Sequence, residues 1–322
     1  MSNYKQLTYE QRCQIEVLNK SGMTQQEIAD AVETSQPTVS RELKRNTGQR
    51  GYRHKQAQGK AEERRHNASK SVKMTELMIA RIELKLSEKW SPEQISGWLS
   101  DEHGETLSHE RIYQHIWADK RTGGALYTHL RRQGKRYQKR CNGKTSRGQI
   151  RNRVGIEERP SVVDEKSRIG DWEIDTVIGK GHSGALVTIV ERATQFTLVA
   201  NVPNKSAEAV TAATIQLLRP YKEALHTITA DNGKEFAYHE QLTAELGVAV
   251  YFARPYHSWE RGLNENTNGL LRQYWPKSTD FTQVTDKDVL AVVTQLNQRP
   301  RKTLGFKTPE VLMQNHMAAQ AA

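Results

Sequence analysis

The sequence has very little cysteine and no long hydrophobic run. Cys13 and Cys141 are its only cysteines, and their separation fits neither a disulfide framework nor a zinc-binding pair. The longest apolar stretches, such as residues 185–190, are only as long as a strand, so we expect no membrane-spanning helix and no membrane partner. Residues 1–6 carry no apolar signal region. These absences together indicate a protein of a reducing compartment.

Acidic residues are missing from one long stretch of the chain. No Asp or Glu occurs from Lys120 to Ile156, whereas twelve Lys and Arg do. Residues 1–160 carry 31 basic and 19 acidic side chains, a net charge of +12, while residues 161–322 carry 17 and 18. A basic half joined to a nearly neutral half favours a part that binds a polyanion, followed by a part with a different task.

Residues 8–46 predict three short helices. Ala29, Glu33 and Val39 match the helix-turn-helix spacing of a small residue, a turn residue and an apolar residue, although the turn position usually holds glycine. The third helix, which we expect Ser35 to cap, is then a recognition helix that enters the major groove of double-stranded DNA. An ordinary three-helix bundle with a polar face is the alternative. The predicted DNA-facing residues are Gln36, Thr38, Ser40, Arg41 and Lys44.

A second helix-turn-helix-like pattern follows a charged segment. Residues 51–88 predict a linker that becomes helical after about Met74. One helix then begins after Ser91, and Ser108 is expected to cap another over residues 110–117. No cysteine accompanies the irregularly spaced histidines of this unit, so surface or base contacts are favoured over zinc binding. The candidate outward residues are His109, Arg111, Gln114 and His115.

Residues 120–160 predict a flexible basic arm. Glycines interrupt its Lys and Arg residues, which favours contacts with DNA phosphates and no reading of bases. A simple disordered linker is compatible with this role. The candidate phosphate contacts include Arg131, Arg132, Lys135 and Arg136.

The pattern changes to alternating strands and helices from residue 161. Three strand-like runs in quick succession are followed by alternating helix and strand, an order typical of the ribonuclease H-like fold. In that fold the first strand is central and the fourth lies beside it. The predicted strands are 171–178, 185–191, 196–202, 227–230 and 248–252, and the predicted helices are 206–218, 235–246, one through Glu265 and 286–298.

The sequence therefore predicts a multidomain fold: all-α helix-turn-helix units followed by an α/β ribonuclease H-like domain. The predicted segments are a helix-turn-helix domain at 1–50, a charged helical linker with the second unit at 51–119, a basic linker at 120–160 and the α/β domain at 161–322.

Three carboxylates of the α/β domain are candidate metal ligands. Asp175 lies in the first strand, Asp231 ends the fourth, and Glu265 lies in a helix. Gathering such groups is costly unless a cation neutralises them, and oxygen ligands suit Mg²⁺ or Mn²⁺ in phosphodiester chemistry. A turn at Asp231 and a solvent-facing Glu265 are the alternatives. Because strand residues alternate in direction, Asp171 or Glu173 could replace Asp175 as the first ligand.

Four motifs of the chain resemble the IS-thirty family of bacterial insertion-sequence transposases, which belong to the DDE group with retroviral-type integrases. The likeness covers nearly the whole chain, and the motifs occur in the family's order. They span residues 170–179, 229–236, 261–272 and 297–310.

The resemblance implies a DNA transposase that binds the terminal repeats of its element, cleaves at the ends and joins them to target DNA. It favours Asp175, Asp231 and Glu265 as the catalytic ligands of two Mg²⁺ (or Mn²⁺) ions in an integrase catalytic core. Arg272 lies two helical turns after Glu265 and is expected to contact a DNA phosphate. The resemblance also implies a homodimer or higher multimer on DNA, and a bacterial, cytoplasmic and nucleoid-associated location.

Two other functions fit parts of the sequence. A DNA-binding regulator with an inactive second domain would bind the element ends without cutting them. A structure-specific ribonuclease H-like nuclease would cut without joining strands, and it would not need helix-turn-helix units.

Overall fold

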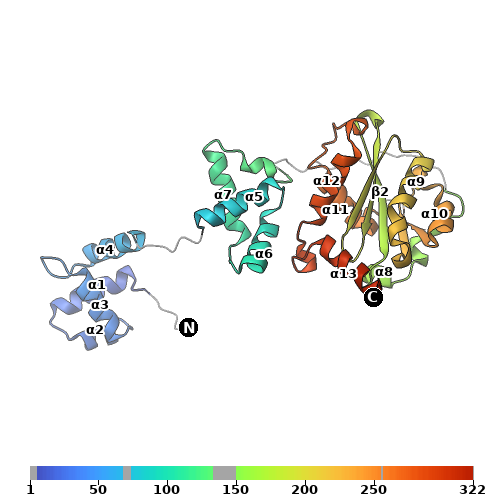
Figure 1. Ribbon diagram of the computed structural model, residues 1–322. Coiled ribbons are helices and arrows are strands. Elements are labelled where there is room, and N and C mark those ends of the chain that lie inside the picture. The colour runs from blue at the N-terminus through green and yellow to red at the C-terminus, as the bar shows by residue number, and fades with distance from the viewer. Residues whose placement is uncertain (1–5, 68–73, 133–149, 255–256, 322) are drawn as a thin grey trace. The chain divides into compact units, whose positions relative to one another are not determined.

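The structure is a computed structural model that describes residues 6–67, 74–132, 150–254 and 257–321 (Figure 1). The chain forms two compact units, residues 1–73 and residues 74–322. No helix in the described residues is long and apolar enough to cross a membrane.

The first unit is built from four helices. Ile15, Ile28 and Val39 are fully buried in its core and come from the three predicted helices. Glu33 has φ 53°, and the N–H of Thr34 donates to the carbonyl of Ala29 at 2.9 Å, so the turn adopts the left-handed backbone for which glycine is usually chosen. The helix-turn-helix prediction is confirmed. The helices are α1 (Tyr9–Lys20), α2 (Gln25–Ala31), α3 (Gln36–Asn46) and α4 (His54–Asn67).

Helix α4 lies in the segment that was expected to be a linker. It packs against α1 and α3, and Ala57 is its one buried residue. The compact unit therefore continues past residue 50. The sequence did not reveal this helix because its side chains are charged or polar on nearly every face, and such a helix has no apolar period.

Three further helices form the start of the second unit. Their core contains Ile82, Leu86, Ile95, Leu99 and Ile112, all fully buried. Ser91 and Ser108 cap two of them as predicted, each accepting a hydrogen bond from a backbone N–H three residues later. The helices are α5 (Glu76–Ser87), α6 (Pro92–His103) and α7 (His109–Arg121).

The rest of the second unit is built on a mixed sheet with the order β1-β6-β5-β2-β3-β4. The first three long strands pair antiparallel, whereas β2 pairs parallel with β5 and β5 pairs parallel with β6. The predicted proximity of the first and fourth strands is therefore confirmed for β2 and β5. The strands are β1 (Val154–Gly155), β2 (Asp171–Ile178), β3 (Ala185–Glu191), β4 (Thr197–Val202), β5 (Thr227–Ala230) and β6 (Ala249–Phe252).

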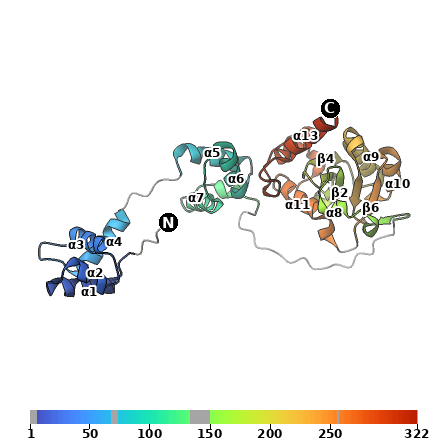
Figure 2. The ribbon, with the colours of Figure 1, turned by 90° about the horizontal axis from the view of Figure 1, so that it is seen from below.

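Helices cover both faces of this sheet, with α9 and α10 on one side of β2 and α11 and α12 on the other (Figures 1 and 2). Trp172 and Ile174 of β2 belong to the hydrophobic core under α9, while Val177 belongs to the core under α11 and α12. By alternation, the acidic residues of β2 face α11. The helices are α8 (Val162–Glu165), α9 (Ala207–Leu218), α10 (His239–Leu246), α11 (Gly262–Leu271), α12 (Asp286–Asn297) and α13 (Pro309–Ala321).

The predicted helix at 235–246 is shorter than expected. A 3-10 turn at Lys234–Phe236 precedes α10, which begins at His239. Glu235 and Phe236 are both buried in this turn, so their side chains hold the backbone close to the sheet before the helix begins. Strand β1 and helix α13 were not predicted.

Candidate active site

Three carboxylates follow one another along the α11-facing side of β2, and the first two are fully engaged. Asp171 is 1% exposed, pairs with Arg168 at 2.8 Å and accepts a hydrogen bond from the Thr227 hydroxyl at 2.7 Å. Glu173 is also 1% exposed and pairs with Arg192 at 2.6 Å. It accepts a further hydrogen bond from the backbone N–H of Asn264 at 3.1 Å. These two acids tie the strand to its neighbours.

Asp175 differs from them because it opens towards solvent. Its side chain is 22% exposed. The amide of Asn268 on α11 donates to Asp175 Oδ2 at 3.0 Å, and the Thr188 hydroxyl donates to the Asn268 amide oxygen at 3.0 Å. The carboxylate is thus oriented from the helix above it. Burial raises the pKa of the Asp175 carboxyl; the Arg261 guanidinium opposes this rise and the nearby Asp231 charge adds to it.

Arg261 joins Asp175 to Asp231. Its Nη1 lies 3.4 Å from Asp175 Oδ2, and its Nη2 lies 3.5 Å from Asp231 Oδ2. The Arg261 side chain is 13% exposed, so it is a largely buried cation between two partly buried carboxylates. Asp231 also forms the turn expected of Asp-Asn-Gly, because its Oδ1 accepts the N–H of Gly233 at 2.8 Å. The predicted turn is therefore present, and the same carboxylate also contacts Arg261.

Glu265 lies on the first turn of α11 and is exposed. It lines a cavity of about 830 Å³ that also contains Asp175, Arg261 and Asn268. We call this space the active-site cavity. Its further walls come from the end of β2, from α11 and from basic side chains. The remaining lining residues are Arg131, Thr176, Val177, Ile178, Gly262, Asn266, Gly269, Arg272 and Lys277.

The donor set suits a hard divalent cation. Asp175 and Asp231 direct one oxygen each towards the same guanidinium, so two carboxylates already face one cation-sized region. Within the described parts of the chain, no three His, Cys, Asp or Glu side chains gather closely enough to bind one ion. A third ligand from Glu265 would therefore need a movement of that exposed side chain within the active-site cavity.

The structure gives the predicted Arg272 two kinds of contact. It lines the active-site cavity with Glu265, and its contact with a DNA phosphate stays a prediction. Its Nη2 also donates to the carbonyl of Ile178 at 2.9 Å, so the side chain holds the end of β2. Its guanidinium lies 5.7 Å from the ring centre of Phe281.

Sequence reasoning missed the cationic partners of the acids, although it named Asn264 and Asn268 as residues that could support the site or the DNA. Arg261 lies four residues before Glu265, at the start of the motif at 261–272, but nothing in this spacing indicated that it bridges two carboxylates. Glu235 was also missed: it is 4% exposed, pairs with Lys205 at 2.6 Å and accepts a hydrogen bond from Thr176 at 3.1 Å. The motif at 170–179 holds three acids and no Lys or Arg, which was a usable signal for a cation from elsewhere in the chain, since buried charges need partners.

The predicted DNA-facing residues lie mostly on accessible surfaces. On α3, Arg41 and Lys44 are exposed, while the other three are half-buried. On α7, His109, Arg111 and Gln114 are exposed.

The remaining candidates divide between partnered, exposed and undescribed residues. The half-buried His115 contacts Glu83 at 2.9 Å, and Arg131 donates to the Asn266 side chain at 2.9 Å. Arg132 is exposed. Lys135 and Arg136 lie outside the described residues.

Comparisons with known proteins agree with both folds. Residues 166–258 match the family model described as an integrase core domain, and residues 3–46 match that of a helix-turn-helix domain. The chain is 46% identical over 321 residues to the transposase for insertion sequence element IS4351 of Bacteroides fragilis, covering 98% of each chain. It is 38% identical over 325 residues to the transposase InsI for insertion sequence element IS30A of Escherichia coli K12, covering 97% of this chain and 84% of that one.

These matches confirm the helix-turn-helix domain and the ribonuclease H-like integrase core that the element order predicted. The similarity to transposases extends over almost the full length of the chain, so it includes both domains and the segments between them. The chain belongs to the IS30 family of insertion-sequence transposases.

Proposed function

We propose that this transposase binds the terminal repeats of its own insertion sequence, cleaves there and joins the freed ends to target DNA, with Asp175, Asp231 and Glu265 as its catalytic carboxylates. The observation that carries the proposal is that Asp175 and Asp231 both contact the Arg261 guanidinium. Asp175, Arg261 and Glu265 all line the active-site cavity. Basic side chains in the same walls suit a DNA backbone.

The first catalytic ligand is Asp175 and not its neighbours on β2. Asp171 and Glu173 are almost fully buried, and their carboxylate oxygens accept hydrogen bonds from arginine, hydroxyl and backbone donors. Displacing those donors would take the buried Arg192 from its buried partner Glu173, which is costly. Asp175 retains access to the active-site cavity.

Asp175, Asp231 and Glu265 would hold the two divalent ions, Mg²⁺ or Mn²⁺, that a DDE transposase uses. When bound, such ions lower the pKa of a nucleophilic water or hydroxyl and stabilise the charge of the leaving oxygen. The acids suit this role because all their donors are oxygens. Asn268 positions Asp175 through its amide, and Thr188 in turn positions Asn268.

The reaction comprises two displacements at phosphorus. Water attacks the phosphate at the element end, the bond to the 3′ oxygen breaks, and the released 3′ oxygen takes a proton. That 3′-hydroxyl then loses its proton and attacks a phosphate of the target strand, displacing the 3′ oxygen there. Arg131, Arg272 and Lys277 line the active-site cavity and would hold the phosphates in line for attack.

The helix-turn-helix units supply the selection of the element ends. The outward side chains of α3 reach the major groove, and those of α7 extend the contact along the DNA. Arg131, Arg132 and the undescribed Lys135 and Arg136 add phosphate contacts. Since two element ends must be held together, the working form is a dimer or higher multimer. The protein works in the cytoplasm, on the nucleoid.

A strand-transfer assay on labelled end DNA with Mg²⁺ tests the proposal. Asp175→Asn, Asp231→Asn and Glu265→Gln should each lower joining by at least about a thousandfold, because each removes a charged ligand. Glu208→Gln, an exposed acid on α9, is the control and should join normally. Normal joining by any of the three variants would remove that residue from the assignment. Binding without cutting by the wild type would indicate a regulator, and cutting without joining would indicate a nuclease.

A further inference from the structure

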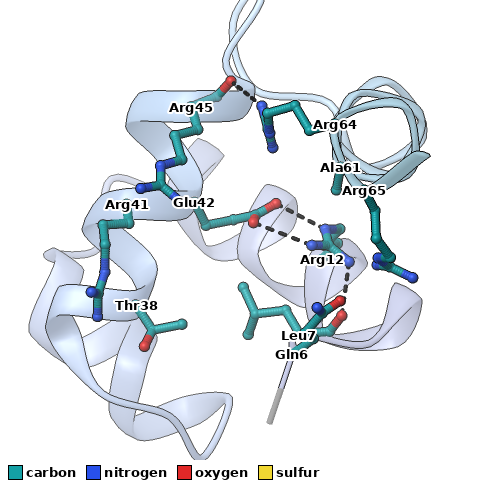
Figure 3. Close-up of a pocket in the computed structure, with 10 residues that line it drawn as sticks. All are labelled: Gln6, Leu7, Arg12, Thr38, Arg41, Glu42, Arg45, Ala61, Arg64 and Arg65. Atoms are coloured by element: carbon teal, nitrogen blue, oxygen red, sulfur yellow. Dashed lines mark hydrogen bonds and ion pairs between the residues drawn. The ribbon is translucent and has the colours of Figure 1, made fainter. Parts of the chain in front are cut away.

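A second charged cavity lies in the first unit, between the recognition helix α3 and helix α4. Its volume is about 510 Å³. Figure 3 shows the arginines of α3 on one side and those of α4 on the other, with Glu42 and Arg12 of α1 between them. We call it the arginine cavity. It is lined by Gln6, Leu7, Arg12, Thr38, Arg41, Glu42, Arg45, Ala61, Arg64 and Arg65.

The single carboxylate of the arginine cavity is already neutralised. Arg12 contacts Glu42 through two nitrogens, at 2.9 and 3.3 Å. The Tyr52 hydroxyl donates to the same carboxylate at 3.0 Å. Arg12 and Glu42 are 5% and 8% exposed, so they form a buried pair that belongs to the scaffold. The positive charge of the other arginines is therefore not balanced by Glu42.

The remaining four arginines have no carboxylate partner among the described residues. All four are exposed, and they come from two helices that pack together. Water weakens the repulsion between these four cations. An anion bound among them would be attracted by each of them. They are Arg41, Arg45, Arg64 and Arg65.

Two of these arginines are held in place by neutral groups. Arg64 donates to the carbonyl of Arg45 at 3.2 Å and to the side chain of Asn46 at 2.5 Å. Asn46 is 1% exposed, so this anchor is itself buried. Arg41 Nε donates to the carbonyl of Pro37 at 2.9 Å. Fixing a guanidinium in advance reduces the entropy lost when it binds a ligand.

The arginine cavity adjoins the face of α3 that is expected to read DNA. Thr38 and Arg41 belong both to its lining and to that predicted face. When a recognition helix lies in the major groove, the sugar-phosphate backbone passes beside it, so a basic site at the edge of that face meets a phosphate. Guanidinium groups match phosphate oxygens in charge and geometry.

We propose that the arginine cavity binds a backbone phosphate of the DNA that α3 reads, and that α4 is the second wall of this DNA-binding surface. The inference rests on end recognition by the helix-turn-helix unit in the proposed function. It adds a new role for Arg64 and Arg65, which lie in a segment that the sequence presents as a linker. A phosphate contact fixes the helix on the duplex without reading sequence.

The test is DNA binding by the full-length chain, measured by fluorescence anisotropy without divalent ions at several salt concentrations. The double variant Arg64→Gln/Arg65→Gln should weaken binding to end DNA and to random DNA by similar factors. The slope of log affinity against log salt should fall by about 1 to 2, because one or two phosphate contacts are lost. The variant Arg64→Lys/Arg65→Lys should keep most of the slope.

The matched control is Arg53→Gln/Lys55→Gln, which removes the same charge at the start of α4 from exposed positions that do not line the arginine cavity. It should change the slope clearly less. An equal change in both double variants would overturn the proposal, because only overall charge would matter. Because Arg64 also anchors α3, Arg65→Gln alone is measured too, and an unchanged slope there would exclude Arg65 from the site.

The outcome is independent of strand transfer, because no cleavage is measured. If the wild type binds end DNA no better than random DNA, the proposed end recognition fails. The slope comparison still decides whether the arginine cavity holds a phosphate.

Discussion

The active-site cavity and the arginine cavity contain similar numbers of charged side chains but arrange them in opposite ways. Beside the active-site cavity, Asp175 and Asp231 share one arginine, Arg261, so within this group the negative charges exceed the cation between them. In the arginine cavity, one carboxylate is fully paired and four arginines remain. The first arrangement favours the entry of a cation and the second the entry of an anion. The way in which the charges are paired, and not their number, thus distinguishes the two sites.

The largest expected effect concerns the scaffold of the arginine cavity. Glu42→Gln should lower the free energy of opening of α1 and α3 by about 3–5 kcal/mol, because Arg12 would remain buried without its partner. Hydrogen exchange of the full-length chain, followed by mass spectrometry, measures this in peptides from residues 9–46. Glu10→Gln, an exposed acid on α1, should change it by less than about 0.5 kcal/mol. Equal exchange in both variants would mean that the Arg12–Glu42 pair does not stabilise the scaffold. The contrast between the two cavities would then be weaker.

The next effect concerns how the active-site acids are held. Asn268→Ala removes the amide that donates to Asp175 and should lower strand transfer by about 10–100-fold, the usual cost of losing a partner that orients a ligand. The apparent Mn²⁺ affinity, measured by calorimetry, should fall with it. Gln241→Ala, on an exposed face of α10, is the control. If activity falls while Mn²⁺ affinity is unchanged, Asn268 acts on DNA and not through Asp175.

The smallest effect has the opposite sign. Arg261→Gln should raise the affinity for Mn²⁺ by about tenfold, or about 1.4 kcal/mol, because the guanidinium and a divalent ion compete for the same two carboxylate oxygens. The matched control is Arg254→Gln, whose side chain is 54% exposed and does not touch either acid. Weaker Mn²⁺ binding in Arg261→Gln would mean that the arginine supports the ion, and the two cavities would then differ less than their charges indicate.

Much of the α/β domain could be predicted because its signals are local. Strands β2, β3 and β5 have the predicted bounds, since apolar side chains alternate or run continuously between clear turn residues. The position of Asp175 beside Asp231 also followed from the element order. By contrast, α4 has almost no apolar face, and β1 has only two residues. Neither gives a periodic pattern to detect.

Sequence reasoning singled out the acids of the candidate site but not their cationic partners. Asp175, Asp231 and Glu265 stand out because carboxylates in apolar surroundings need an explanation. The separate fates of Asp171 and Glu173 depend on Arg168, three residues before Asp171, and on Arg192, which follows β3 and meets Glu173 only in the folded chain. Arg261 is similar: its two contacts require the end of β5 and the middle of β2 to lie together.

The double attachment of α11 to β2 has a mechanical consequence. Glu173 binds the backbone of Asn264, and Asp175 binds the side chain of Asn268. Two residues of a strand advance about 6.8 Å and four residues of a helix advance about 6 Å, so the two spacings nearly coincide. The two contacts therefore fix the register of α11 along β2. Inserting one residue between Asn264 and Asn268 would prevent both contacts from forming together and would displace Glu265 from the acids of the sheet.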